Sequence, residues 1–357
     1  MSENLPTGAK EYSDGNGKYV GDDTLGYLHD SVKHPVSSSD EYDTDLDLPK
    51  VVTKRNCAAA VKPRQPSRNV YELGCVEYDQ TPHSAIVTGL SQPTLVLRYR
   101  SIGSQAMKPL CMALICNEIV TVLDLEDTDI GHEGALYLAE ALRENFVIRH
   151  LNIANNHVGD NGIEAIANTL CHNTTVSYLN ISGNKLTDNF GKALSTLLTE
   201  NDSILRLHAN YNCMRQKSAV ELGKALSGNN SLEHLDLSWN SFTGQAAVRL
   251  FAGLQNNTCL KLLDLSWNGI GYDGGASLSK LLRKNRTLEY IDMSNTRIMW
   301  QNTQSLAWGI RNNDVLKVLK LGGNPLTTTG SMTLLEGIGE DTCSLELLDI
   351  TLQVDLT

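Results

Sequence analysis

The chain has 357 residues, of which 41% are hydrophobic, 20% charged and 6% aromatic, and its formal net charge is −11. This composition is typical of a globular protein, and the excess of acid argues against nucleic-acid binding, which rests on clustered Lys and Arg. The sequence has no signal peptide and no apolar window long enough to cross a bilayer, so we expect a cytoplasmic protein without a membrane partner.

The N-terminal segment is polar and lacks hydrophobic periodicity. Residues 1–49 are rich in Asp, Ser, Gly and Tyr, and such a composition buries too little apolar surface to offset the entropy lost on ordering. We therefore predict a disordered acidic tail over 1–49. Residues 50–68 contain basic residues and two prolines but no acid, which predicts a linker.

From residue 92 onward the sequence repeats. The clearest pair is LEHLDLSWNSF at 232–242 and LKLLDLSWNGI at 260–270, and their tryptophans, Trp239 and Trp267, differ in number by 28. We number each repeat from the first Leu of the LDL motif, called position 0. Positions 0 and 2 are apolar, the alternation of a short strand with one buried face. Position 0 holds Leu95, Leu123, Leu151, Leu179, Leu207, Leu235, Leu263, Ile291, Leu319 and, one residue late, Leu348.

Farther along each repeat the apolar spacing widens to three or four residues, as at Ile166, Ala167 and Leu170, which predicts a helix. An Asn follows each helix at one fixed place. We expect its backbone to adopt the left-handed conformation that ends helices. The series is Asn117, Asn145, Asn173, Asn201, Asn229, Asn257, Asn285 and Asn313.

A second Asn series stands at position 5, just after the strand. A short amide there can bond to the backbone of the adjoining turn, so we predict a structural role. Thr128 and Thr296 replace the Asn in two repeats, and we expect those two turns to be looser. The Asn series is Asn156, Asn184, Asn212, Asn240, Asn268 and Asn324.

Repeated strand, turn and helix units predict an α/β solenoid. Strands that are joined through helices must be parallel. Because strands are about 4.8 Å apart and the helices behind them are roughly 10 Å across, the stack must curve. We expect about ten strands on the concave face and helices on the convex face.

The pattern LxxLxLxxNxIGxxGxxxLxxxLxxN resembles the ribonuclease-inhibitor-like class of leucine-rich repeats over residues 92–357. Within it, LKLLDLSWNGIGYDGGASLSKLL and VLDLEDTDIGHEGALYLAEAL look like the leucine-rich repeat-containing protein 74 family (A and B). The resemblance implies a horseshoe without known catalysis. GCVEYDQTPHSAIVTGL is similar to that family's N-terminal cap, which implies a capping segment at 69–91.

Two rows on the strands are candidates for partner binding. Position 1 carries Asp236, Asp264 and Asp292 on three consecutive strands, with His208 and His234 beside them. These acids repel one another, and a basic protein partner would relieve the repulsion. Position 4 carries Tyr211, Trp239 and Trp267, residue types that serve as binding anchors. Packing of these rings against the neighbouring turn is the alternative.

Catalytic and metal chemistry find little support in the sequence. His208, Asp236 and Ser238 form a candidate catalytic trio, but Ser recurs at that repeat position as Ser182, Ser266 and Ser294, which favours a consensus role. His208, His234 and Asp236 are a candidate metal set, although polar residues on a solenoid are usually only solvated. The eight cysteines show no metal spacing, so we expect unpaired thiols, no metal and no cofactor.

We therefore predict a non-enzymatic protein-protein interaction module that binds a protein partner on its concave face. Two alternatives remain open. One is a regulator of an enzyme, similar to the GTPase activators or the ribonuclease inhibitor built on this repeat class. The other is a structural component of cilia or flagella, by resemblance to repeat proteins found there.

Overall fold

The computed structural model describes residues 67–339 and 344–351. The predicted tail at 1–49 and nearly all of the predicted linker lie outside these residues. Helix α2 (Ser67–Glu77) takes in the last two residues of that linker, and α3 (Ser84–Gly89) follows it. Both helices precede the first repeat and contribute buried side chains to the core.

Ten strands of three residues each form one open, parallel sheet in chain order, as the sequence predicts. Partners on neighbouring strands are 28 residues apart, or 29 for the last pair, so that Leu235 pairs with Leu207 on one side and with Leu263 on the other. The strands are β1 (Thr94–Val96), β2 (Val122–Asp124), β3 (His150–Asn152), β4 (Tyr178–Asn180), β5 (Arg206–His208), β6 (His234–Asp236), β7 (Leu262–Asp264), β8 (Tyr290–Asp292), β9 (Val318–Lys320) and β10 (Leu347–Asp349).

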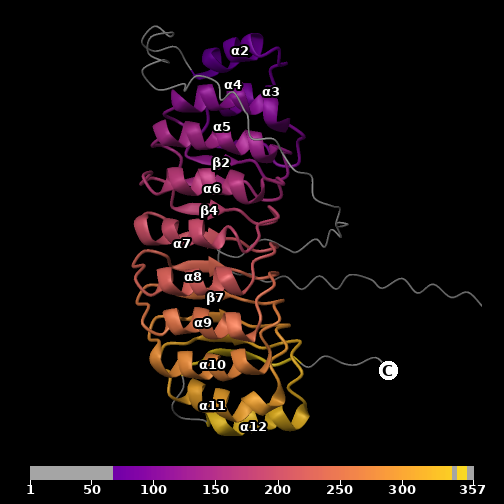
Figure 1. Cartoon of the computed structure of the whole chain (residues 1–357), viewed down its shortest axis with the longest axis vertical. Coiled ribbons are helices and arrows are strands. Elements are labelled where there is room, and N and C mark those ends of the chain that lie inside the picture. The colour runs from indigo at the N-terminus through magenta and orange to yellow at the C-terminus, as the bar shows by residue number, and fades with distance from the viewer. Residues whose placement is uncertain (1–66, 340–343, 352–357) are drawn as a thin grey trace, which may run out of the picture. The chain divides into compact units, whose positions relative to one another are not determined.

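The helices follow one another in chain order along the stack (Figure 1). Each packs against the next, and together with the sheet they form an α/β solenoid. The helices are α4 (Gly103–Ile115), α5 (Gly131–Glu144), α6 (Gly159–Leu170), α7 (Gly191–Glu200), α8 (Gln216–Leu226), α9 (Gly244–Leu254), α10 (Gly271–Lys284), the 3-10 helix η1 (Trp300–Asn302), α11 (Thr303–Arg311) and α12 (Thr328–Ile338).

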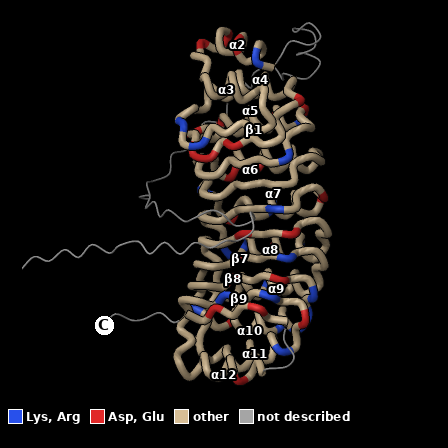
Figure 2. The backbone as a smooth tube through the Cα atoms, turned by 180° about the vertical axis from the view of Figure 1, so that it is seen from behind, with Lys and Arg blue, Asp and Glu red and all other residues tan. Residues whose placement is uncertain are grey.

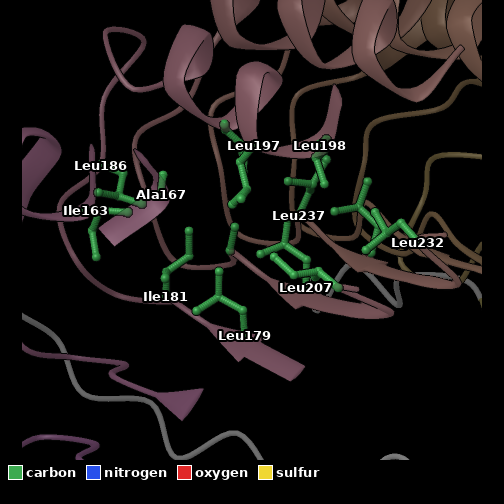
Figure 3. Close-up of a cluster of buried hydrophobic side chains, with 14 of the residues drawn as sticks. Ile163, Ala167, Leu179, Ile181, Leu186, Leu197, Leu198, Leu207, Leu232 and Leu237 are labelled. Atoms are coloured by element: carbon green, nitrogen blue, oxygen red, sulfur yellow. The ribbon is translucent and has the colours of Figure 1, made fainter. Parts of the chain in front are cut away.

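The core lies between the sheet and the helices. Side chains at positions 0 and 2 are fully buried from β1 to β9, as the alternation predicts. Figure 3 shows Leu207 and Leu237 from the strand side gathered with Leu197 and Leu198 from α7. Each fully buried Leu contributes roughly 2 kcal/mol of hydrophobic free energy, and the contribution recurs in every repeat.

The asparagines at position 5 connect consecutive repeats through their side chains. Asn240 Nδ2 donates to the carbonyl of Ala209 in the preceding repeat at 3.0 Å and to Leu237 in its own at 3.1 Å. Its Oδ1 accepts from the amide of Met214 at 3.1 Å. The predicted structural role is confirmed, because one amide here satisfies backbone groups of two turns.

Threonine at position 5 does not open the turn. Thr296 is fully buried, and its hydroxyl donates at 2.6 Å to the carbonyl of Met293, the position-2 carbonyl that Asn reaches in other repeats. Because a hydroxyl has one proton to donate, Thr lacks the two further bonds that an Asn Nδ2 makes, to the preceding repeat and to the position-3 carbonyl of its own repeat. The expected loosening is therefore not seen at this turn.

The asparagines that follow the helices are not left-handed, and the prediction was wrong on this point. Asn145, Asn201 and Asn285 have φ of −94°, −107° and −71°. None of the eight Asn residues of this series has a positive φ. Their recurrence has another cause, which lies in the buried side chain rather than in the backbone conformation.

Asn257 shows that cause. Its Nδ2 donates to the carbonyl of Leu226 at 2.7 Å and to that of Asn229 at 3.1 Å, both in the preceding repeat. Its Oδ1 accepts from the amides of Cys259 at 3.0 Å and Leu260 at 2.7 Å. The side chain thus bridges the end of one helix and the start of the next strand, where backbone groups would otherwise be buried without partners.

We predict that Asn257→Ala lowers the free energy of unfolding by at least about 3 kcal/mol, because it leaves several buried backbone groups unsatisfied. Chemical denaturation measures the change. The neighbouring Asn256, which is exposed, provides the matched control, and Asn256→Ala should change stability by less than about 0.5 kcal/mol. Equal effects of the two substitutions would contradict the bridging role.

Candidate functional site on the strand face

The sheet has one face covered by the core and one open face, which we call the strand face. Residues at positions −1 and 1 flank the buried position 0 and lie on the strand face. Charged residues of both signs are interspersed along the repeats (Figure 2). From β2 to β10, position 1 holds Asp124, Asn152, Asn180, His208, Asp236, Asp264, Asp292, Lys320 and Asp349.

Most position-1 residues have a structural role that the sequence analysis missed. Asp236 Oδ1 accepts the amide of Ser238 at 3.0 Å, and Asn152 Oδ1 accepts that of Ala154 at 3.1 Å in the same way. The same bond occurs at Asn180, Asp264, Asp292 and Asp349. An Asn makes this bond as well as an Asp does, so the backbone explains the restriction to Asp and Asn but not the negative charge.

Two of the three candidate acids have a basic side chain beside them. Asp236 Oδ2 lies 3.4 Å from His208 Nδ1, and Asp292 Oδ2 lies 3.6 Å from Lys320 Nζ. Asp264, between them, forms no ion pair with any Lys, Arg or His of residues 67–339 and 344–351. Burial, and then the charges of Asp236 and Asp292, raise the pKa of Asp264 to about 7.

Lys320 shows how the strand face holds a cation. Its ammonium lies 5.2 Å from the ring centroid of Tyr290 as well as 3.6 Å from Asp292. Burial opposes the charged form, but the hydrogen bond and charge of Tyr290 and the charge of Asp292 raise the pKa of Lys320. An aromatic ring and a carboxylate therefore stabilise an ammonium together on this face.

Tyr211, Trp239 and Trp267 form a continuous stack, which we call the aromatic ladder. The ring centroids of Tyr211 and Trp239 lie 5.1 Å apart, those of Trp239 and Trp267 lie 4.3 Å apart, and both pairs are 11° from parallel. Tyr211 is 39% exposed and Trp267 46% exposed. The rings thus pack on one another, the alternative weighed from the sequence, and two of them also leave much of their surface open.

The backbone of the aromatic ladder is left-handed, a second feature that sequence reasoning missed. Tyr211, Trp239 and Trp267 have φ of 53°, 51° and 57°. The other position-4 residues share this conformation and are mostly the types that tolerate it: Tyr99, Asp127, Asn155, Gly183, Asn295 and Gly323. A positive φ costs a bulky residue roughly 1–2 kcal/mol of conformational free energy, so the backbone favours Asn or Gly over Trp at this position.

The histidines and Ser238 do not form a catalytic relay. Ser238 Oγ donates to Asp236 Oδ1 at 2.8 Å, so the serine and His208 both bond to the carboxylate, whereas a relay requires the imidazole to accept from the serine. His234 lies on β6 next to this group, and burial followed by the charge of Arg206 lowers its pKa. Among the described residues no three His, Cys, Asp or Glu side chains are grouped as metal ligands would be.

Other features of the described chain bear on its setting. Six cysteines are free thiols, as expected from their spacing: Cys75, Cys111, Cys116, Cys171, Cys213 and Cys259. The remaining two, Cys57 and Cys343, lie outside the described residues. Over 67–339 and 344–351, no helix has the length and apolar character needed to span a membrane.

Comparison with known families identifies the repeats. A model of the leucine-rich repeat family matches five segments of the chain, at residues 116–139, 144–167, 172–195, 228–251 and 256–279. The chain therefore carries leucine-rich repeats. No curated protein matches it by sequence.

Three solved structures illustrate what the chain is similar to. Leiomodin-1 actin-binding site 2 is 18% identical over 40% of this chain and 86% of its own, with a TM-score of 0.35. The tropomodulin C-terminal domain of Caenorhabditis elegans is 13% identical over 49% and 90%, with a TM-score of 0.33. An internalin of Listeria monocytogenes is 13% identical over 82% and 99%, with a TM-score of 0.37.

We predict that Trp267→Asn leaves the free energy of unfolding within about 1 kcal/mol of the wild type. Relief of left-handed strain, roughly 1–2 kcal/mol, offsets the stacking lost with Trp239, roughly 0.5–1.5 kcal/mol. Urea denaturation measures the difference. A loss above about 3 kcal/mol would show that the indole is needed for folding.

We also predict that Asp264→Asn stabilises the fold more at pH 8 than at pH 5. Because the pKa of Asp264 is raised from 3.8 to about 7, the folded state retains this proton where the unfolded state has lost it, and stability falls as pH rises through that window. Asn keeps the acceptor for Ser266 and removes the charge. Thermal denaturation at both pH values measures the effect, with Asp202→Asn, at an exposed site, as control. A pH-independent difference would contradict the assignment.

Proposed function

We propose that the chain is a non-enzymatic protein-interaction module, without a cofactor, whose strand face binds a protein partner. The binding surface combines the aromatic ladder with the acidic row of Asp236, Asp264 and Asp292, and His208 and His234 border it. One observation carries the proposal: two indoles and a phenol are stacked and partly exposed in a backbone conformation that favours Asn or Gly.

Residues whose backbone conformation is unfavourable for their type are concentrated at functional sites. The rings at position 4 depart from the Gly, Asn or Asp found there in the other repeats, Tyr99 excepted, and this departure supports a role besides folding. Trp and Tyr dominate the energy of protein interfaces, because they bury a large area and lose few rotamers on binding. Here stacking already restricts the rings, which lowers the entropy lost when a partner binds.

The rigidity of the repeats supports the same proposal. Asn240 and Asn257 each connect adjacent repeats through buried amides, on the two sides of the strand. Side chains at positions 1 and 4 therefore stand on a fixed spacing from one repeat to the next. A preorganised surface of this kind favours binding of a folded or extended protein segment without rearrangement of the module.

The acidic row favours a partner with basic character. Negative charges on consecutive strands attract Lys and Arg, and such attraction chiefly raises association rate and selectivity. A cytoplasmic setting belongs to the proposal and is supported by the unpaired thiols. The resemblance to the leucine-rich repeat-containing protein 74 family is consistent with it, as is the match to leucine-rich repeats.

We predict that Trp239→Ala combined with Trp267→Ala lowers capture of bound proteins at least tenfold in quantitative affinity purification from cytosol. The matched control is Trp308→Ala, which removes an exposed indole from α11 in the helix layer. Capture by the wild type should also weaken between 50 and 300 mM salt, since salt screens the electrostatic attraction between the acidic row and a basic partner.

Two outcomes would contradict the proposal. If the double variant remains folded and captures the same proteins in the same amounts, the aromatic ladder is not the binding surface. If Trp308→Ala reduces capture as strongly, binding occurs on the helix layer instead.

A further inference from the structure

We propose that the strand face binds a phosphoserine or phosphothreonine side chain of the partner at Arg206 on β5, with His208 and His234 as further donors. The inference rests on the proposed function and names a chemical group that the strand face recognises. Three features of the described residues carry it: a guanidinium without a counter-charge, its position between neighbours on two strands, and the number of N–H donors gathered there.

Arg206 is a half-buried cation without a counter-charge in the described chain. Its guanidinium forms no hydrogen bond or ion pair with any group of residues 67–339 and 344–351. Other cations of the sheet region are paired: Lys320 lies 3.6 Å from Asp292, and Arg98 forms an ion pair with Asp124. A half-buried charge without a partner is unfavourable, so Arg206 fits an anion supplied from outside.

Two acids stand in the next repeat, and both are engaged with other groups. Asp236 accepts from the amide and the hydroxyl of Ser238 at 3.0 and 2.8 Å, and its second oxygen lies 3.4 Å from His208 Nδ1. Glu233, just before β6, forms an ion pair with Lys261 at 2.8 Å. Neither carboxylate therefore compensates the guanidinium on β5.

The strand register places Arg206 between two rings. At position −1 it pairs with Tyr178 on β4 and with His234 on β6, so the three side chains stand side by side on the strand face. His208 lies two residues farther along β5 on the same face, and its ring centroid lies 5.1 Å from that of Tyr178. His150 extends the row and stacks on Tyr178 at 3.7 Å. Two imidazoles are thus close neighbours of the guanidinium.

The charge of Arg206 acts on one of these imidazoles. Burial and then the charge of Arg206 lower the pKa of His234, and His208 acts in the same direction, whereas Glu233 opposes them. A dianion bound here reverses this effect, because it favours the protonated form of both imidazoles. Each imidazolium then donates N–H groups to the bound anion.

A phosphate monoester fits this group of donors better than a carboxylate. The guanidinium donates two parallel N–H bonds to either anion. The phosphate monoester also has a third terminal oxygen and a charge of about −2 at pH 7, so it accepts from the imidazoles as well. Protonation of His208 beside it offsets the charge of Asp236, the carboxylate that would otherwise repel the ligand.

The acidic row lies within reach of the same partner segment. From β5 to β7 the sheet spans two strand spacings, about 10 Å, which an extended chain covers in about three residues. For a segment that crosses the strands, a basic residue three positions from the phosphorylated one therefore stands over β7, the strand of Asp264.

The test uses the whole chain and isothermal titration calorimetry at pH 7. The probe is an acetylated, amidated peptide, Arg-Ala-Ala-phosphoserine-Ala-Ala-Arg, in which an arginine on each side suits either direction of binding. We expect the same peptide to bind at least about tenfold more weakly with serine, and at least about threefold more weakly with glutamate, in place of phosphoserine. Failure of the probe to bind, or equal affinity of the serine peptide, would overturn the anion site. Equal affinity of the glutamate peptide would overturn the preference for phosphate.

Substitution of Arg206 tests the guanidinium. Arg206→Gln should weaken binding of the probe at least about tenfold, and Arg206→Lys, which keeps the charge but not the planar donors, about threefold. The matched control is Arg249→Gln, at an exposed arginine on α9 in the helix layer, which should leave the affinity within about twofold. Equal affinities of the wild type and Arg206→Gln would contradict the proposal.

The ring C–H signals of histidine locate the bound probe on the wild-type chain by NMR, independently of any loss of folding in a variant. Single His→Gln substitutions assign them. We expect saturable shifts at His208 and His234, and none at His132 on α5 or at His172, which follows α6. Shifts confined to His132 and His172 would place the probe off the strand face and overturn the site.

Failure of this site and failure of the proposed function give different results. If partner capture still depends on Trp239 and Trp267 while the phosphoserine peptide does not bind, the strand face is an interaction surface that recognises a different group. If capture is independent of both indoles, the proposed function fails whatever the peptide does.

Discussion

The structure depends on the need to satisfy backbone polar groups where one repeat meets the next. Short strands, sharp turns and helices leave carbonyls and amides buried between layers, and water does not reach them. Two rows of buried asparagine satisfy them, one after the strands and one after the helices, each side chain bonding to its own repeat and to the one before. These bonds, together with leucine burial, hold consecutive repeats in one register.

The constant register decides what the strand face can be. Residues at position 1 of consecutive repeats are neighbours one strand spacing apart, and so are residues at position 4. A residue type that recurs at either position in consecutive repeats therefore forms a row on the strand face. Acids stand at position 1 of β6, β7 and β8, where Asn suffices, and aromatic rings stand at position 4 after β5, β6 and β7, where Asn or Gly is favoured, so both rows depart from what the backbone needs in the repeats of β6 and β7. Departures at two positions in the same repeats are the main support for the proposed binding surface.

The sequence predicted those parts of the structure that depend on burial. Leu235 and Leu263 had to be neighbours once the 28-residue period was read, and the strand order and core followed from it. Side-chain hydrogen bonding was harder, because Asn both tolerates a left-handed backbone and bonds well to buried peptides, so Asn257 was assigned the wrong role. Its partners lie one repeat earlier and become visible only when the repeats are stacked.

The sequence identified the rows of residues that make up the candidate site, but not their backbone conformation or their hydrogen bonds. The rows containing Trp239 and Asp264 were identified from the period, whereas the left-handed backbone and the Ser266 bond were not. A signal for both was present: Gly, Asn and Asp recur at position 4, and Asp and Asn at position 1, a composition that indicates turn geometry. What the sequence could not give is the uncompensated state of Asp264, because that depends on where the cations of neighbouring strands lie.

Hydrogen exchange of individual amides tests the central claim, that buried asparagines hold the repeats together. The amides of Leu232, Leu260 and Leu288 lie outside the regular helices and strands and donate to Asn229, Asn257 and Asn285 at 2.8, 2.7 and 2.8 Å. We expect them to exchange only with global unfolding, as slowly as the core strands. Exchange at the rate of exposed loops would contradict the account, because it would show that the repeats stay together without these bonds.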